Sequence, residues 1–241
     1  MILKDQKIFF HHIPKTGGKT ISDFLVRYYN LPYRSLLHFD QGCYVSPKLS
    51  DKTINTVYNI CHLPYLELLR LTKEANIIID DSWDIFAIVR NPYYRITSAI
   101  FFQSILECKW HIHALPTLSE KRKLFKKSYN LFFDSDPIGN DWFSHRLPQH
   151  LLLETDPNKP IYKLYKYEDG LENILKDALG YRIKEDINLG NIHSMEFEDN
   201  YPKPNYSDLF TRGYINKINE YYYEDFRFCG YEMWDPLDFP E

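Results

Sequence analysis

Residues 7–29 read KIFFHHIPKTGGKTISDFLVRYY, and this stretch decides the fold. Its first part, Lys7–Ile13, is a short apolar run that predicts a buried β-strand. Pro14–Thr20 follows as a glycine turn, and Ile21–Tyr29 repeats apolar residues at helical spacing. A strand, a glycine turn and a helix in this order form a cradle whose backbone N–H groups bind phosphate.

The rest of the chain alternates between strand and helix patterns, which predicts an α/β fold. Further strands are expected at Thr56–Cys61, Asn76–Ile79, Trp83–Val89 and Ile161–Tyr167. Helices are expected at Tyr65–Thr72, after Pro92, and at Pro116–Leu131, Glu168–Leu179 and Thr211–Phe226, with a long loop over residues 186–210. We therefore expect one P-loop-like domain over residues 1–241, a three-layer sandwich with a central, mainly parallel sheet flanked by helices.

Composition excludes several classes of protein. The formal net charge of −4 argues against a surface that grips nucleic acid or an anionic membrane as a whole. No run approaches the ~18 apolar residues of a membrane span, and the N-terminus has no signal-peptide pattern. We expect a cytoplasmic, soluble protein. Its cysteines form no CxxC pair and His111 and His113 have no further ligands nearby in sequence, so we expect reduced thiols and no metal site.

The glycine turn holds several anion-binding groups. Gly17 and Gly18 let the backbone approach an oxyanion, Thr16 and Thr20 add hydroxyls, and Lys15 and Lys19 add positive charge. The end of the turn also matches the Walker pattern of nucleotide hydrolases, although Ile13 stands where that pattern has its first glycine. Because Ile77–Asp80 resembles a Walker B strand, an ATP-dependent kinase or NTPase remains an alternative.

A second motif follows about seventy residues later. Residues 88–99, IVRNPYYRITSA, leave a strand and open a helix. Arg90 stands at the strand end and Ser98 lies two turns into the helix. A guanidinium and a hydroxyl brought together can bind a phosphate.

Together the two motifs resemble those of the sulfotransferases that use 3′-phosphoadenosine 5′-phosphosulfate (PAPS), in particular the carbohydrate, hexuronyl 2-O-sulfotransferase-like branch. HIPKTGGKT resembles the family's 5′-phosphosulfate loop, with Lys19 where the family usually has Thr. The resemblance implies that Lys15 contacts the oxygen between phosphate and sulfate and that residues 17–20 bind the 5′ phosphate. It also implies that Arg90 and Ser98 bind the 3′ phosphate. Residues 165–171 and 222–231 resemble two less specific family segments.

A histidine is the expected base for the acceptor hydroxyl. His62 lies in a segment that resembles the base-bearing segment of the hexuronyl branch, with Cys61 in place of a glycine. A histidine that caps the next helix is the alternative. His145, in SHRLPQ, resembles an acceptor-side segment of the same branch. His11 is expected in the core or at the sheet edge, and His12 is expected to support the loop.

Lys123 and Lys126 belong to a basic helix that either binds an anionic glycan or faces solvent. The sequence thus predicts in-line transfer of a sulfuryl group from PAPS to a hydroxyl of a glycan or glycoconjugate, with release of 3′-phosphoadenosine 5′-phosphate (PAP). Besides the kinase, a nucleotide- or glycan-binding protein without catalysis is the other alternative.

Overall fold

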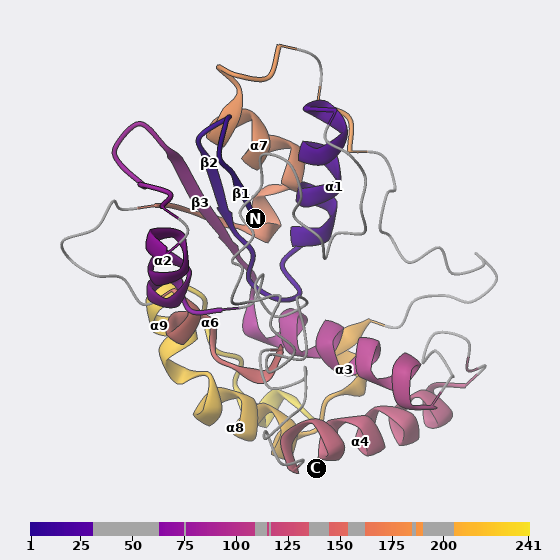
Figure 1. The fold of residues 1–241 in the computed structure, drawn as a ribbon. Helices are drawn as coiled ribbons and strands as arrows, with labels where there is room; N and C mark the ends of the chain where they lie inside the picture. The colour runs from indigo at the N-terminus through magenta and orange to yellow at the C-terminus, as the bar shows by residue number, and fades with distance from the viewer. Residues whose placement is uncertain are drawn as a thin grey trace. The chain divides into compact units, whose positions relative to one another are not determined.

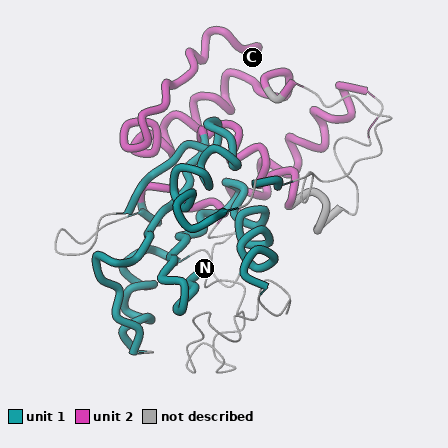
Figure 2. Tube along the Cα trace, turned by 90° about the horizontal axis from the view of Figure 1, so that it is seen from above, with its two compact units in different colours: residues 1–90, 151–193 teal, residues 91–150, 194–241 magenta. Residues whose placement is uncertain are grey.

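The computed structural model describes residues 1–30, 63–74, 76–108, 115, 117–134, 145–153, 162–184, 187–189 and 205–241. The strand expected at Thr56–Cys61, His62 and most of the loop expected over residues 186–210 lie outside the described residues. The chain divides into two compact units, residues 1–90 with 151–193 and residues 91–150 with 194–241 (Figure 2). The single domain over residues 1–241 stays a prediction.

The first unit is built on a four-stranded sheet in the order β1-β2-β3-β4. The short β1 (Ile2–Leu3) is antiparallel to β2 (Ile8–His11), whereas β2, β3 (Asp84–Val89) and β4 (Lys163–Lys166) are parallel. Three helices lie around it: α1 (Gly18–Tyr28), α2 (Tyr65–Glu74) and α7 (Leu171–Leu179) (Figure 1). The α/β prediction with a mainly parallel sheet is confirmed.

Successive side chains of β2 point alternately to the two faces of the sheet, and each face is covered by helices. Ile8 and Phe10 belong to a buried cluster that also holds residues of α1 and α7. Phe9 and His11 point to the other face, where their rings lie 5.6 and 5.7 Å from that of Tyr65 in α2. Since successive side chains of a strand point to opposite faces, this sheet is covered on both.

The strand expected at Asn76–Ile79 is wrong. Asn76 has a φ of +56°, and the N–H groups of Asn76 and Ile77 donate to carbonyls of the last turn of α2. Ile77 is buried but Ile78 is 80% exposed. The segment therefore ends a helix and does not join the sheet. Asp80, the acid of the Walker B-like pattern, accepts a 2.9 Å hydrogen bond from the N–H of Ser82 and stabilises a turn.

The second unit is helical and rich in aromatic residues. Its helices are α3 (Pro92–Cys108), α4 (Leu118–Asp134), α8 (Arg212–Tyr221) and α9 (Tyr223–Cys229). One buried cluster joins α3, α4, α8 and α9 through Tyr93, Phe125, Ile218 and Phe226. The helix expected at Thr211–Phe226 is two helices, because the backbone leaves helical geometry at Tyr222.

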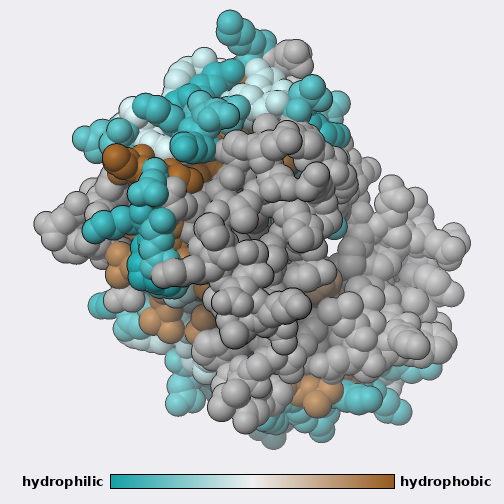
Figure 3. Space-filling view, in the orientation of Figure 1, coloured by the Kyte–Doolittle hydropathy of each residue, from teal (hydrophilic) through white to brown (hydrophobic). Residues whose placement is uncertain are grey.

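Short elements complete the described part of the chain: α6 (Gln149–Leu152) and the 3₁₀ turns η3 (Tyr167–Asp169), η4 (Tyr206–Leu209) and η5 (Pro236–Asp238). On the face drawn in Figure 3, hydrophilic side chains are prominent in the described surface, and hydrophobic ones appear in small separate areas. Among the helices of the described ranges, none is long and apolar enough to cross a membrane.

Candidate functional site

The ends of three parallel strands assemble a site in the first unit. β2 leads through His12 into the glycine loop, β3 ends at Val89 immediately before Arg90, and β4 ends at Lys166 immediately before Tyr167. Because the carboxyl ends of parallel strands share one edge of a sheet, these segments meet. Nη1 of Arg90 donates to the Lys15 carbonyl at 3.2 Å, and the guanidinium lies over the Tyr167 ring at 4.4 Å.

The loop adopts a backbone conformation that few residues allow. Lys15 has a φ of +68° and Gly17 a φ of +82°. A left-handed conformation is easy for glycine but costs a lysine roughly 1 kcal/mol or more. The Thr16 hydroxyl is buried and donates to the Ile13 carbonyl at 2.9 Å, so it braces the loop from inside. Thr16 can therefore offer an anion its N–H group, while its hydroxyl is already used.

Both glycines are also required by packing. A Cβ on Gly18 would lie 1.9 Å from Cδ2 of His12, and a Cβ on Gly17 would lie 2.8 Å from Leu171. The His12 ring is held by stacking on Phe10, with centroids 5.7 Å apart. His12 therefore supports the loop, as expected from the sequence, by filling the space beside Gly18.

The start of α1 offers backbone donors. Gly17 is the N-cap residue and has no side chain that could accept from the first turn, and the first helical bond runs from the Ile21 N–H to the Gly17 carbonyl. The N–H groups of Gly18, Lys19 and Thr20 therefore have no partner within the helix, and the helix dipole adds positive potential there. An anion is the ligand that fits such an end.

Positive charge accumulates beside these donors. The pKa of Lys15 is lowered to about 8, first by burial and then by the charges of Arg90 and Lys19. The charges of Arg90 and Lys19 are both positive, and an anion bound beside the ammonium would relieve their repulsion. The chemistry of this edge of the sheet suits phosphate or sulfate.

The sequence model of the sulfotransferase family matches residues 1–232. The chain belongs to this family. No significant match was found among curated proteins or among solved structures. The loop and Arg90 of this sulfotransferase lie together in the first unit.

Further predicted residues belong to the second unit or lie outside the described residues. Ser98 is half-buried on α3, two turns after Pro92 in the second unit. Lys123 and Lys126 are exposed on α4, whose N-terminus has a capping box between Thr117 and Glu120. Lys121, on the same helix, is 6% exposed, because α4 turns this position toward the protein interior. His62, the predicted base, lies outside the described residues.

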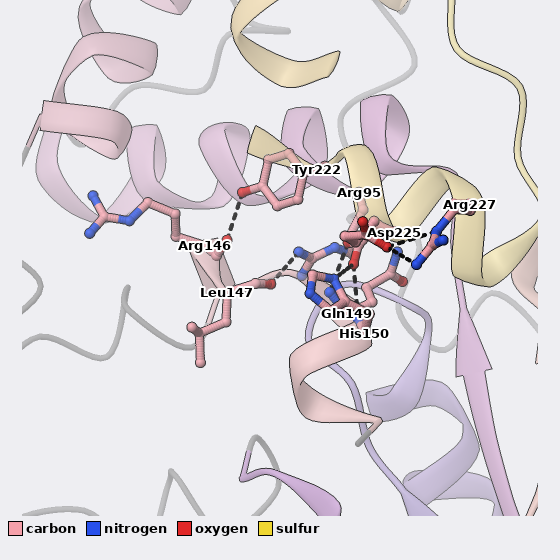
Figure 4. A network of polar contacts seen from close by, with 9 residues as sticks. Arg95, Arg146, Leu147, Gln149, His150, Tyr222, Asp225 and Arg227 are labelled. Carbon is pink, nitrogen blue, oxygen red and sulfur yellow. Dashed lines mark hydrogen bonds and ion pairs between the residues drawn. The ribbon is translucent and has the colours of Figure 1, made fainter. Parts of the chain in front are cut away.

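His145 is buried in a segment that side chains of the second unit hold in place. Its ring stacks on Phe102 with centroids 5.9 Å apart. The guanidinium of Arg95 donates to the His145 carbonyl at 3.2 Å. It also donates to the Leu147 carbonyl at 2.6 Å, and the Tyr222 hydroxyl donates to the Arg146 carbonyl at 2.6 Å (Figure 4). Three consecutive carbonyls are therefore fixed from α3 and from the residue between α8 and α9.

Asp225 completes this arrangement, and the sequence did not indicate its structural role. Its carboxylate is fully buried and accepts 2.8 Å bonds from the N–H groups of Gln149 and His150 and from Nδ1 of His150 (Figure 4). The signal in the sequence was the family-like segment at residues 222–231, which contains Asp225. Nothing local in that segment indicates a partner seventy-five residues away.

Proposed function

We propose that this sulfotransferase moves the sulfuryl group of PAPS to a hydroxyl of a carbohydrate-like acceptor, as in the hexuronyl 2-O-sulfotransferase-like branch. In an in-line displacement the acceptor oxygen forms a bond to sulfur while the bond from sulfur to the 5′-phosphate oxygen breaks. The hydroxyl proton leaves to a base. The products are a sulfate ester, PAP and one proton.

One observation carries the proposal for the donor. Lys15 and Arg90, which come from the ends of two strands, are joined by a 3.2 Å hydrogen bond beside the uncapped start of α1. A nucleotide with phosphates at both ends offers one anionic group to the loop and another to Arg90. PAPS, when bound, supplies the sulfuryl group and a phosphate that can leave.

Several residues of the loop then have a role in the reaction. The N–H groups of residues 17–20 hold the 5′ phosphate, and the Lys15 ammonium stabilises the negative charge that develops on the oxygen released from sulfur. Lys15 adopts a left-handed backbone conformation, which is unfavourable for a lysine. Such strain is typical of functional sites, where the position of a side chain is essential. Arg90, oriented by the Tyr167 ring, binds the 3′ phosphate together with Ser98.

His62 is the proposed base, because a neutral imidazole accepts a proton near neutral pH. The acceptor would be a glycan or glycoconjugate. Lys123 and Lys126 are exposed cations on one helix, and they would attract an anionic glycan by a salt-dependent contact.

Calorimetric titration with PAP, with ADP and with ATP–Mg²⁺ tests the donor site. We expect PAP to bind best and Arg90→Ala to weaken PAP by roughly 10- to 100-fold, the usual worth of a charge-assisted hydrogen bond. ADP, which has no 3′ phosphate, should lose much less with the same variant. Preference for ATP–Mg²⁺ with indifference to PAP would refute the proposal and favour a kinase.

A further inference from the structure

Tyr167 lies where β4 ends, beside the end of β3. Val89 pairs with Lys166 in the parallel ladder between these strands, so the next residue of each strand, Arg90 and Tyr167, leaves the sheet beside the other. Tyr167 then begins η3, and its carbonyl accepts a 3.1 Å hydrogen bond from the N–H of Gly170. The backbone that carries the Tyr167 side chain is therefore fixed by the sheet on one side and by a turn on the other.

The ring of Tyr167 contacts two parts of the candidate site. The guanidinium carbon of Arg90 lies 4.4 Å from the ring centroid. The glycine loop also passes close to the ring, because a Cβ on Gly17 would lie 3.0 Å from Cε2 of Tyr167. The ring is half-buried and packs against the core cluster that holds residues of α1 and α7. Core packing thus keeps the ring in place beside the loop and Arg90.

The guanidinium of Arg90 is held in two different ways. Its Nη1 donates to the Lys15 carbonyl at 3.2 Å, and its carbon lies over the face of the Tyr167 ring. A cation is attracted to the face of an aromatic ring without the use of any N–H group. A long side chain that is already ordered loses less rotamer freedom when it binds a ligand. The ring therefore orders the guanidinium before an anion arrives.

We propose that Tyr167 is a positioning residue that gives the donor site its preference for a 3′ phosphate, by ordering the Arg90 guanidinium on the face of its ring. This inference rests on the proposed function, in which Arg90 binds that phosphate. A role in core packing alone would require only an apolar side chain of similar size. The positioning role requires the aromatic face and does not require the hydroxyl.

Two substitutions of Tyr167 separate these roles. Tyr167→Leu keeps an apolar side chain at this half-buried position but removes the aromatic face, whereas Tyr167→Phe removes only the hydroxyl. The matched control is Tyr165→Leu, because Tyr165 lies two residues earlier on β4 and packs against the same core cluster. Each variant is titrated by calorimetry with PAP and with adenosine 5′-monophosphate (AMP), which lacks the 3′ phosphate. Urea unfolding verifies that each variant is folded.

We expect Tyr167→Leu to weaken PAP binding by about 3- to 10-fold, the usual worth of a cation–π contact, and to change AMP binding by less than about 2-fold. Tyr167→Phe and Tyr165→Leu should bind PAP within about 2-fold of wild type. Unchanged PAP affinity in Tyr167→Leu, an equal loss for PAP and AMP, or an equal loss in Tyr167→Phe would each overturn the positioning role.

A double variant tests whether the ring acts through Arg90. In the background of Arg90→Ala, Tyr167→Leu should weaken PAP binding by no more than about a further 2-fold, because its partner is already absent. A full second loss in that background would overturn the inference and leave the donor site in place. Wild-type protein that binds PAP no better than AMP would instead refute the proposed donor site itself.

Discussion

Lys15 should take up a proton when an anion binds beside it. Its pKa of about 8 in the free protein reflects burial and two neighbouring positive charges. Bound phosphate adds negative charge, which favours the ammonium form and raises the pKa toward the usual value near 10.5. Between these two pKa values the free protein has lost the proton and the complex has kept it. PAP affinity should therefore be highest below pH 8 and fall above it.

The magnitude follows from linkage. For a pKa of about 8, binding should take up about 0.1 proton at pH 7, about 0.5 at pH 8 and about 0.9 at pH 9. Above pH 8 the association constant should fall by up to about tenfold per pH unit. Proton uptake is measured by calorimetry in pairs of buffers with different ionisation enthalpies at constant ionic strength.

The matched variant is Lys15→Met, which keeps much of the side-chain length and cannot titrate. It should bind PAP more weakly and lose the proton uptake between pH 7 and 9, while any uptake by the phosphates of PAP itself remains. Equal uptake by wild type and Lys15→Met, or a wild-type affinity that is flat up to pH 9.5, would refute the assignment of Lys15 to the phosphate site.

Three further predictions concern the glycine loop, the buried Asp225 carboxylate and the basic helix α4. Gly18→Ala places a Cβ 1.9 Å from the His12 ring and should lower the free energy of unfolding, measured in urea, by roughly 1–3 kcal/mol. The control is Gly213→Ala at an exposed position, where the nearest atom is 3.8 Å from the new Cβ and the free energy of unfolding should not fall. Asp225→Ala removes the buried acceptor of three hydrogen bonds and should lower the free energy of unfolding by about 3 kcal/mol or more. The neighbouring Glu224→Ala should lower it by about 0.5 kcal/mol or less, and similar losses would contradict the role of Asp225. The double variant Lys123→Ala, Lys126→Ala should bind an anionic polysaccharide more weakly, and its affinity should depend less on salt concentration, while PAP affinity is unchanged. An unaltered salt dependence of polysaccharide binding would assign both lysines to a solvated face.

Local patterns predicted the elements that carry the donor site. β2, the glycine loop and α1 are consecutive in the chain, and each has its own signal: an apolar run, two glycines and a helical repeat. The segment Asn76–Ile79 was mistaken for a strand because apolar content alone does not reveal whether a neighbouring strand pairs with it. β1, with two residues, is too short to show a pattern.

The reason for the glycines was only partly visible in the sequence. Gly17 and Gly18 were interpreted as giving an anion access to the backbone. The structure adds that side chains at these positions would collide with Leu171 and His12. The collision with Leu171 depends on residues far apart in the chain, so no local pattern could have predicted it. The same holds for the stacking of Arg90 on Tyr167.

The second motif combines residues with different purposes. Arg90 and Arg95 both match it, yet Arg95 has no exposed surface and its two terminal nitrogens donate to the carbonyls of His145 and Leu147. A guanidinium used in this way supports the backbone and does not bind phosphate. Since Arg95 and Ser98 lie on the same helix, its contacts with residues 145–147 fix the helix that carries Ser98. Arg95→Lys should therefore lower stability more than PAP affinity, because an ammonium cannot hold both carbonyls in the same geometry.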